Sequence, residues 1–468
     1  MTKPDTAMPT TLVSPTEDRA TLSAARRLVR FARELRAVEL PDKVVEKVEL
    51  CVFDMLACSL TARDLPWSCQ AVSWVRGLGA TAEATVIGAN LRTAPSEAAF
   101  ANAVQAHGLV REDMHTPSVS HCGVVVLPTA LAIAEARHAS GSELIAAVVA
   151  GYQAMGRLGR VVIDSENARV FRPTGLLGPV GGTLAAARLL ALDEDTAVNA
   201  LGLAGNLGAG LNEWAHTGGT EMFFQPGFAA RNSVTAATLA AVGATASETI
   251  LDGRAGMIAA FGGAARAALL SQDLGDDFEI LAVYHKPAPA CNYVQTPCQA
   301  ALEVVTRDGI DSRQVDSVQV LTFPAALAYP GCDYAGPFTS MLQAKMSIQF
   351  SIASVLAHRE LAEANFRRLD DPETTRIAAR VELSTDPEFT AGYPSRQGAE
   401  VRVRLVSGQT LRKRLSDLRP VEPAEVRARF RDAATQTFGD RKAREIEETV
   451  GTLRQLDDVA RLMKLLNC

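Results

Sequence analysis

The sequence is poor in aromatic side chains, which make up only 5% of its 468 residues, although 47% of the residues are hydrophobic. Alanine in short clusters supplies much of that hydrophobic fraction, so we expect helices that pack closely through small side chains. A chain of this length predicts two domains, or one large domain with an insertion, and has enough residues for a substantial core.

The sequence also lacks long apolar runs and an excess of positive charge. No apolar run reaches the roughly 20 residues of a membrane-spanning helix. The polar N-terminus, MTKPDTAMPTTLVSPTEDRA, has no apolar signal core, so we expect a cytoplasmic protein with a disordered tail over residues 1–20. The net charge of −6 argues against nucleic acid as a partner, since such binding needs a basic surface.

The eight cysteines show no C-x-x-C spacing of the kind found in zinc and redox motifs. We therefore expect reduced thiols, most of them filling positions in the core.

Helical periodicity dominates the first half of the chain. Apolar residues at helical spacing predict helices over 21–36, 41–60, 96–109, 127–137, 142–158, 181–192, 196–209 and 228–242. Glycine, proline and polar residues predict irregular segments over 107–121, 169–179 and 210–227.

The pattern changes after residue 272. We expect strands over 278–284, 315–323, 377–383, 399–406 and 410–415, helices over 296–307 and 345–357, and a return to helices over 423–466. This order predicts a mainly α protein: a large all-helical domain (residues 21–272 and 419–468) with a smaller inserted α+β domain, the lid (residues 273–418).

The segment 107–128, HGLVREDMHTPSVSHCGVVVLP, is the leading candidate for a functional site because it holds three of the seven histidines and a Glu-Asp pair. An imidazole or carboxylate can act as a general base when burial and neighbouring charges tune its pKa, and Glu112, Asp113, His115 and His121 are close enough in sequence to do so. In the alternative reading, the acidic residues cap a helix and the histidines are structural.

Several segments carry a family resemblance, in order over about residues 20–440: VFDMLACSLTA, ANAVQAHGLVREDMH, HCGVVVLPTALAIAEA, FRPTGLLGPVGGTLAAARLLALD, QPGFAARNSVTAATLAAVG, ILDGRAGMIAAFGG, KPAPACNYVQTPCQAAL and QAKMSIQFSIASVLA. The chain resembles the MmgE/PrpD family, which includes 2-methylcitrate dehydratase, cis-aconitate decarboxylase and iminodisuccinate epimerase. The resemblance implies a homodimer without metal or organic cofactor. It also implies an active site between the helical domain and the lid, where a base removes a proton next to a carboxylate and cationic groups stabilise the enolate.

The chain departs from this family at basic positions. A family histidine is replaced by Arg172, a Lys-Arg-His run by Met222, Phe223, Phe224 and Gln225, and further basic or histidine positions by Cys291, Asn292 and Gln295. A family aspartate falls at Val110, and a family Asp-Asp-Thr-His motif reads Glu-Asp-Met-His at 112–115.

These departures predict a less anionic, more apolar substrate. A charge-assisted hydrogen bond contributes about 1.5 to 3 kcal/mol, so losing two of them lowers the affinity roughly 100-fold to 10,000-fold. Arg172 can replace one of the two lost contacts. Met222, Phe223 and Phe224 then predict an apolar pocket wall, with burial of the phenylalanines in the core as the alternative.

As a hypothesis, His121 is the base or acid, Asp113 with Glu112 orients it, and His115 is a second proton-transfer group. Further candidates contact the substrate: Arg172 as a carboxylate or enolate ligand, Thr174, Gln225, Asn292 and Tyr293 as hydrogen-bond donors, Lys286 and Lys345 as cations, and Cys291 as a thiol donor or a packing residue.

We expect a small-molecule enzyme of specialised metabolism, a cofactor-independent lyase of dehydratase or decarboxylase type. An isomerase, epimerase or cyclase would use the same proton-transfer site without releasing a fragment. A non-catalytic relative that binds a metabolite is a third alternative, because a fold does not determine a function.

Overall fold

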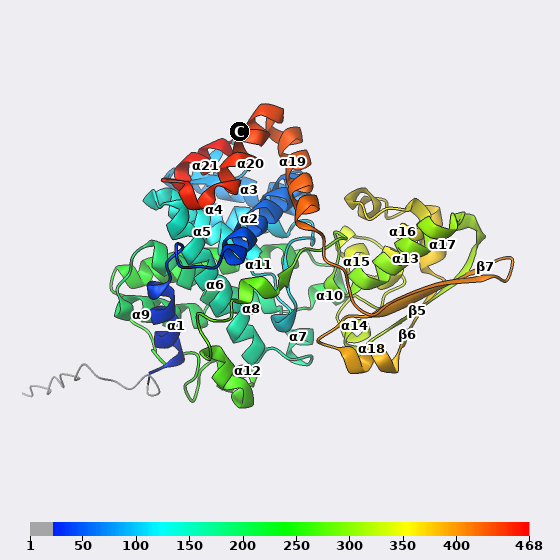
Figure 1. Ribbon diagram of the computed structural model, residues 1–468, viewed down its shortest axis with the longest axis horizontal. Helices are drawn as coiled ribbons and strands as arrows, with labels where there is room; N and C mark the ends of the chain where they lie inside the picture. The colour runs from blue at the N-terminus through cyan, green and yellow to red at the C-terminus, as the bar shows by residue number, and fades with distance from the viewer. Residues whose placement is uncertain (1–21, 468) are drawn as a thin grey trace, which may run out of the picture.

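The computed structural model describes residues 22–467, so the tail predicted over residues 1–20 lies outside the described residues. A large helical body stands beside a smaller α+β part (Figure 1). The predicted fold class, mainly α with an α+β lid, is confirmed. The boundaries of the predicted domains, 21–272, 273–418 and 419–468, stay a prediction.

Long helices form the body, and they pack at short distance. A Cβ atom on Gly181 of α8 would lie 2.7 Å from the carbonyl oxygen of Gly151 on α6, so only glycine permits this approach. The close packing expected from small side chains is therefore confirmed. The long helices are α1 (Ala24–Glu34), α2 (Asp42–Ala62), α3 (Pro66–Leu78), α4 (Pro95–His107), α5 (Gly123–Arg137), α6 (Gly141–Val162), α8 (Pro173–Leu189), α9 (Glu194–Gly205) and α11 (Glu221–Ala241).

Short elements connect these helices. Two strand pairs accompany them, β1 (Ala84–Val86) with β2 (Leu91–Thr93) and β3 (Met114–His115) with β4 (Val283–Tyr284). The short helical elements before the lid sheet are η2 (Thr116–Ser118), α7 (Asn167–Val170), α10 (Trp214–Thr217), α12 (Met257–Phe261), η3 (Ala264–Leu270) and η4 (Glu279–Ala282).

A four-stranded sheet forms the centre of the lid. Its strands are β5 (Val315–Thr322), β6 (Val381–Thr385), β7 (Ala399–Leu405) and β8 (Thr410–Leu415), in the order β6-β5-β7-β8. The β5 and β6 strands are parallel and the other pairs antiparallel, and α13 (Gln295–Asp308) packs on β7 and β8. The remaining lid elements are η5 (Asn292–Val294), η6 (Ser312–Gln314), α14 (Pro324–Ala328), α15 (Met341–Met346), α16 (Ile348–His358), η7 (Glu363–Arg367), α17 (Pro372–Ala378) and α18 (Pro387–Gly392).

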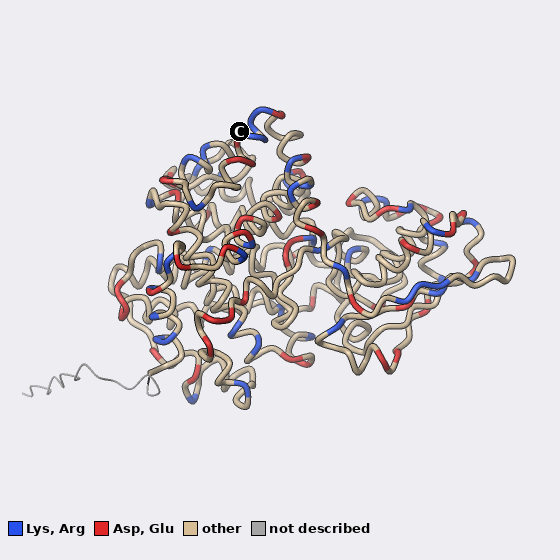
Figure 2. Tube along the Cα trace, in the orientation of Figure 1, with Lys and Arg blue, Asp and Glu red and all other residues tan. Residues whose placement is uncertain are grey.

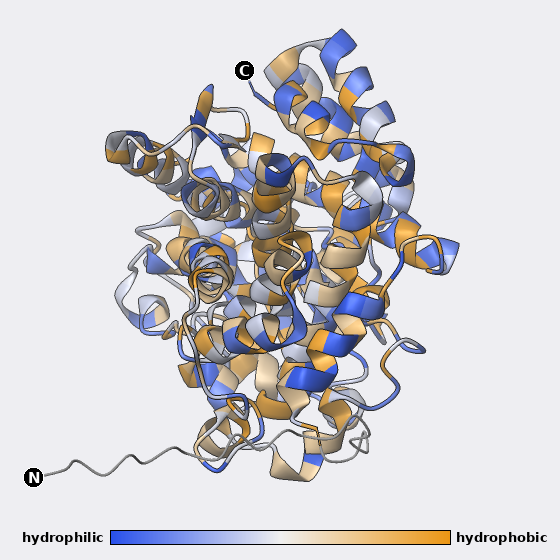
Figure 3. Ribbon diagram, turned by 90° about the vertical axis from the view of Figure 1, so that its left-hand side faces the viewer, coloured by the Kyte–Doolittle hydropathy of each residue, from blue (hydrophilic) through white to orange (hydrophobic). Residues whose placement is uncertain are grey.

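The chain returns to the body after the lid, as predicted. The C-terminal elements are α19 (Pro423–Phe438), α20 (Asp440–Gly451), η8 (Leu453–Gln455) and α21 (Val459–Leu465). The α19 helix packs on α2 and α21 on α5, so both halves of the chain build the body (Figure 1). In the hydropathy view, the helices carry both apolar and polar residues (Figure 3).

Basic residues gather on β7 and β8 (Figure 2). Carboxylates pair with them: Arg414 with Asp386, Glu388 and Glu400, Arg402 with Glu400, and Lys413 with Glu303. No helix within residues 22–467 is long and apolar enough to cross a membrane.

Two predicted strands were wrong in whole or in part. Residues 279–282 form the 3-10 helix η4, and only Val283 and Tyr284 pair as a strand, because a short apolar run does not distinguish helix from strand. In the strand predicted over 377–383, residues 377 and 378 instead form the end of α17. Pro372 and the Asp371 carboxylate, which accepts the Thr374 N–H at 2.9 Å, fix the start of this helix.

Predicted helix boundaries were also wrong: α8 begins at Pro173, inside the irregular segment predicted over 169–179, and contains Pro179. The α11 helix begins at Glu221 rather than at residue 228 and contains Pro226, because Gly227 packs closely on Val104 and Phe100 of α4 and this contact outweighs the local break. The helix predicted over 345–357 is divided in two, since Ser347 caps α16 by accepting the Phe350 N–H at 2.9 Å.

Candidate active site

The segment 107–121 leaves the end of α4, pairs with β4 through β3 and reaches α5 at Gly123, so it lies where the body meets the lid. Val110 and Val119 adopt positive φ angles of 59° and 50°, a strained conformation for a β-branched residue. Two buried lysines hold this backbone. Lys286 Nζ donates to the Val110 carbonyl oxygen at 2.7 Å and Lys345 Nζ to the Leu109 carbonyl oxygen at 3.0 Å.

Glu112 lies between two imidazoles. Its Oε1 atom is 2.7 Å from Nδ1 of His107 and 3.2 Å from Nδ1 of His121, and all three side chains are buried. Burial opposes ionisation of Glu112, but the two histidines and Lys286 outweigh it and hold the pKa of this carboxyl well below its usual range. Glu112 is therefore a buried carboxylate in contact with both rings.

Hydrogen bonds assign the neutral tautomer of His121. Its Nδ1 lies 2.9 Å from the carbonyl oxygen of Asp113, which can only accept, so Nδ1 carries the proton and Nε2 keeps its lone pair. Burial and the charge of Lys286 lower the pKa of His121 well below its ordinary value, which keeps the ring neutral near pH 7. The backbone N–H of His121 donates to Thr174 Oγ1 at 3.0 Å. His121 is thus a fixed, neutral imidazole with a free lone pair on Nε2.

A small closed cavity adjoins His121. Its free volume is about 10 Å³, room for a single water molecule. Two valines and two methionines form the apolar part of its wall, and the other lining residues are polar or aromatic. The lining residues are Val110, Met114, Val119, His121, Arg172, Cys291, Asn292, Tyr293, Tyr329 and Met346.

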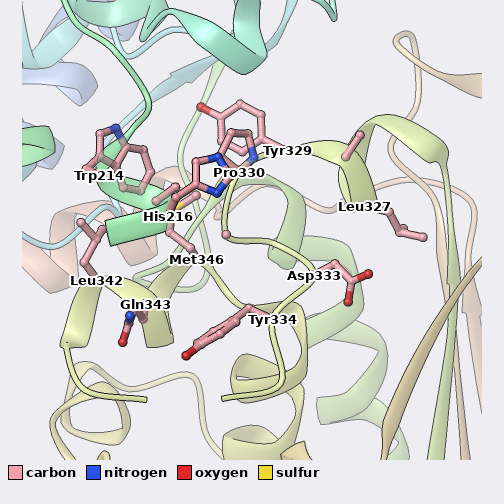
Figure 4. A pocket seen from close by; sticks show the side chains of 13 residues that line it. Trp214, His216, Leu327, Tyr329, Pro330, Asp333, Tyr334, Leu342, Gln343 and Met346 are labelled. Carbon is pink, nitrogen blue, oxygen red and sulfur yellow. The ribbon is translucent and has the colours of Figure 1, made fainter. Parts of the chain in front are cut away.

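Tyr329 borders three cavities at once. A pocket of about 400 Å³ beside α10, α14 and α15 shares Tyr329 and Met346 with the small cavity (Figure 4). A second pocket, of about 510 Å³, shares Val119, Tyr293 and Tyr329 with it. The Tyr329 hydroxyl lies 3.1 Å from Nη1 of Arg172, which anchors the wall between these spaces.

The Asp113 carboxylate points into the core rather than toward His121. It accepts hydrogen bonds from the Tyr152 hydroxyl at 2.7 Å and from the Gly123 N–H at 3.0 Å. Burial raises the pKa of Asp113 despite the Tyr152 bond. Only the Asp113 backbone carbonyl reaches His121, so the structure brings Glu112, and not the Asp113 side chain, to that ring.

His115 lies apart from the small cavity, with both ring nitrogens engaged. Its Nδ1 is 2.7 Å from Ser118 Oγ and its Nε2 is 2.7 Å from Glu279 Oε2. Glu279 also binds Arg157 and Arg160, each at 2.8 Å. The structure therefore places His115 in a buried ion-pair network behind the site.

The expected apolar wall at Met222 and Phe223 also lies apart from the small cavity. Both side chains are fully buried, and the Phe223 ring stacks on Trp67 with centroids 3.7 Å apart. Gln225 Nε2 donates to the Leu211 carbonyl oxygen at 2.9 Å. The structure thus favours the core alternative for the two apolar residues and replaces this wall with valines, methionines and tyrosines.

The other residues predicted to contact the substrate divide into those that line the small cavity and those that do not. Lys286 and Lys345 do not line the small cavity, because their ammonium groups bind backbone carbonyls. Cys291, which precedes η5, and Asn292 and Tyr293 of η5 do line it. The Asn292 amide nitrogen donates to Gln397 Oε1 at 2.9 Å, and the Tyr293 hydroxyl lies 3.0 Å from that of Tyr393.

Sequence reasoning gave no role to Tyr329, Met346 or the His107 ring. Tyr329 precedes a Pro-Gly turn in AYPGCDY, which marks a loop but not a cavity wall. Within residues 22–467, no group of three or more His, Cys, Asp or Glu side chains is arranged to hold a metal ion.

Comparisons with known proteins cover nearly the whole chain. Residues 26–269 match the MmgE/PrpD N-terminal domain and residues 288–455 the MmgE/PrpD C-terminal domain. A cis-aconitate decarboxylase of Aspergillus terreus is 26% identical over 94% of this chain and 95% of its own length. The human cis-aconitate decarboxylase is 23% identical over 92% of each chain. The cis-aconitate decarboxylase-like protein oryM of Aspergillus oryzae is 27% identical over 48% of each chain.

Proposed function

Because the chain belongs to the MmgE/PrpD family, we propose that it is a lyase of dehydratase or decarboxylase type that needs no cofactor and acts next to a carbonyl or carboxylate. The observation that carries this proposal is a neutral His121 with an unprotonated Nε2, which lines a small cavity together with Arg172. The relatives named as cis-aconitate decarboxylases support the lyase class.

His121 performs the proton transfer in this mechanism. Its Nε2 removes a proton from the carbon next to the substrate carbonyl or carboxylate, and the resulting imidazolium is stabilised by the Asp113 carbonyl and the Glu112 carboxylate. In a dehydration, the electron pair of the broken C–H bond forms the double bond, and the imidazolium proton leaves with the hydroxyl group as water. In a decarboxylation no C–H bond is broken: the bond to the carboxylate breaks, its electron pair stays on the carbon as carbon dioxide leaves, and that carbon takes a proton from His121, which has taken it up from solvent.

Arg172 binds the oxygen on which negative charge develops. Its two terminal nitrogens are held by the Tyr329 hydroxyl at 3.1 Å and by His107 Nε2 at 3.2 Å, so the guanidinium is oriented before the substrate arrives. A fixed, buried cation stabilises an enolate more strongly than it would in water.

The cavity wall supports a monocarboxylate with an apolar remainder as the substrate. Arg172 supplies a cationic side chain to the wall, whereas Val110, Met114 and Met346 supply apolar surface. A free volume of about 10 Å³ does not hold an organic acid, so the lid must move away from the body to admit one. Closure afterwards excludes water from the carbanion. We also propose a cytoplasmic homodimer, as the family resemblance implies.

An isomerase or epimerase is the second candidate. The specific observation in its favour is that the Cys291 thiol lines the same small cavity as His121, so two proton-transfer groups share one substrate site. Such an enzyme would move a proton without releasing water or carbon dioxide.

Incubation in D₂O with a panel of apolar 3-hydroxy and unsaturated monocarboxylic acids tests these readings. We expect deuterium at the carbon next to the carboxylate, together with loss of water or carbon dioxide by mass spectrometry. Exchange without a mass loss would favour the isomerase, and no exchange with any acid would favour a non-catalytic binding protein.

The variant His121→Ala should abolish exchange, and His138→Ala is the matched control because His138 is 73% exposed and pairs with Asp458 on the surface. A folded His121→Ala protein with unchanged turnover would refute the proposal.

A further inference from the structure

Two lid cysteines meet directly behind the small cavity. Cys291 Sγ lies 3.6 Å from Cys332 Sγ, both thiols are free, and both side chains are buried. Cys291 precedes η5 and lines the cavity, whereas Cys332 lies in the loop after α14. Segments 41 residues apart in sequence therefore bring two thiols into contact at the site.

The backbones of both cysteines are fixed to one turn of the chain. The Cys291 N–H donates to the Lys345 carbonyl oxygen at 2.9 Å, and the Cys332 carbonyl oxygen accepts the Ile348 N–H at 2.9 Å. The end of α15 and the start of α16 therefore hold both backbones in place. The sulfur atoms then approach each other by rotation of the cysteine side chains. An approach of about 1.5 Å gives the S–S bond length of a disulfide.

The surroundings distinguish the two thiols chemically. Burial would raise the pKa of Cys291, but hydrogen bonds from the Cys332 thiol and the Tyr293 N–H, with the charges of Lys286 and Arg172, outweigh burial and lower it. Burial raises the pKa of the Cys332 thiol well above its ordinary value. Since the thiolate is the nucleophile, Cys291 is the residue that reacts with an oxidant.

We propose that Cys291 and Cys332 form an oxidation-sensitive dithiol, which hydrogen peroxide converts into a disulfide in the wall of the cavity. The Cys291 thiolate attacks one peroxide oxygen, breaks the O–O bond and becomes a sulfenic acid, while hydroxide leaves and takes up a proton as water. The Cys332 sulfur then displaces the sulfenic oxygen as a second water and forms the S–S bond. Two thiols are oxidised and one peroxide is reduced.

The surroundings of the two cysteines indicate how peroxide reaches them and what the disulfide does to the site. Cys291 lines the small cavity, and the pocket of about 400 Å³ adjoins that cavity at Tyr329 and Met346, so peroxide approaches Cys291 from this side. The Cys332 N–H donates to the Tyr329 carbonyl oxygen at 3.1 Å, so the disulfide ties the Tyr329 wall to η5. Oxidation removes the Cys291 thiol from the cavity and restrains the lid segments that border it. The disulfide forms whatever reaction the site catalyses.

Peroxide treatment of a Cys69→Ser protein, which lacks the thiol that is exposed among residues 22–467, tests the proposal. We expect a loss of two hydrogens in intact mass, a Cys291–Cys332 cross-linked peptide after alkylation and digestion, and reversal by dithiothreitol. Adding Cys332→Ser should abolish the cross-link and leave a sulfenic acid at Cys291 that dimedone traps. Adding Cys298→Ser is the matched control, because Cys298 is a buried thiol on the adjacent α13 and should leave the cross-link intact.

Full alkylation of Cys291 and Cys332 after peroxide and unfolding, at the level of the untreated protein, would overturn the proposal. So would a cross-link that joins Cys291 to another cysteine. Both readouts come from the Cys69→Ser protein alone, so they decide the question even where a cavity variant does not fold.

Discussion

Arg172 Nη2 lies 3.2 Å from Nε2 of His107, and this contact determines which nitrogen of His107 carries the proton. A guanidinium only donates hydrogen bonds, so Nε2 accepts and the proton sits on Nδ1, which donates to Glu112 at 2.7 Å. A second proton on His107 would oppose the Arg172 charge. The chain Arg172–His107–Glu112 therefore requires a neutral imidazole in its middle.

This requirement predicts a loss of stability at mildly acidic pH. Burial, only partly offset by Glu112, lowers the pKa of His107 in the folded protein, whereas the unfolded chain has the ordinary value of about 6.5. The unfolded state thus binds more protons below that value, and the stability present at higher pH is lost as pH falls toward the folded pKa. We expect the free energy of unfolding in urea to fall between about pH 7.5 and about pH 5.5.

The variant His107→Gln should reduce this pH dependence, because glutamine keeps a donor and an acceptor without titrating. His138→Gln, at an exposed site, should leave it unchanged. Equal slopes for wild type and His107→Gln would contradict the prediction.

Glu112 and Asp113 should differ in what their loss does. Glu112→Gln removes the carboxylate beside His121, so we expect kcat to fall by about 100-fold or more, with a small change in KM. Asp113→Asn weakens the bonds to Tyr152 and Gly123, so we expect a lower free energy of unfolding, by about 1 to 3 kcal/mol. Steady-state kinetics and urea denaturation of both variants separate these effects. A large loss of kcat in Asp113→Asn with little change in Glu112→Gln would mean that the Asp113 side chain orients His121.

Phe223→Ala tests whether this ring belongs to the core or to the substrate site. Its stack on Trp67 predicts a loss of stability of about 3 to 5 kcal/mol without a change in substrate preference. Phe228→Ala, on the same helix but 48% exposed, should cost much less. A stable Phe223→Ala protein with altered preference among acids of different chain length would place Phe223 at the substrate after all.

Much of the fold could be predicted because local pattern and tertiary contact agree there. The alternating run at 315–323 and the hairpin over 399–415 became β5, β7 and β8, since alternation sets which face is buried. Prediction failed where tertiary contacts outweighed local signals. The Pro-Gly pair at 226–227 marks a break in sequence, yet it lies within α11 because Gly227 fits against α4.

The site was only partly predictable for a similar reason. The cluster of Glu112 and His121 is local, so its chemistry is visible in one short segment. Which carboxylate faces the ring depends instead on Tyr152 of α6, and the cavity wall depends on Tyr329, more than 200 residues away in sequence. A single sequence without structure contains no signal that links these positions.

The proposed substrate class rests on Arg172, and replacement of this residue tests it. Arg172→Gln removes a charge-assisted contact of about 1.5 to 3 kcal/mol, so KM for a monocarboxylate should rise by roughly tenfold to 150-fold. Arg169→Gln is the matched control, because the Arg169 side chain is 51% exposed and pairs with Glu166. An unchanged KM in Arg172→Gln would remove this residue from the substrate site.

The wild-type protein also allows a test of the charge of the substrate. Lys286 and Lys345 already bind backbone carbonyls, so a second carboxylate on the substrate would enter an apolar wall without a cation to meet it. We therefore expect wild type to bind a dicarboxylate more weakly than a monocarboxylate of the same length, in a direct comparison of KM. Tighter binding of the dicarboxylate would mean that a lysine releases its carbonyl on lid closure, and it would contradict the monocarboxylate assignment.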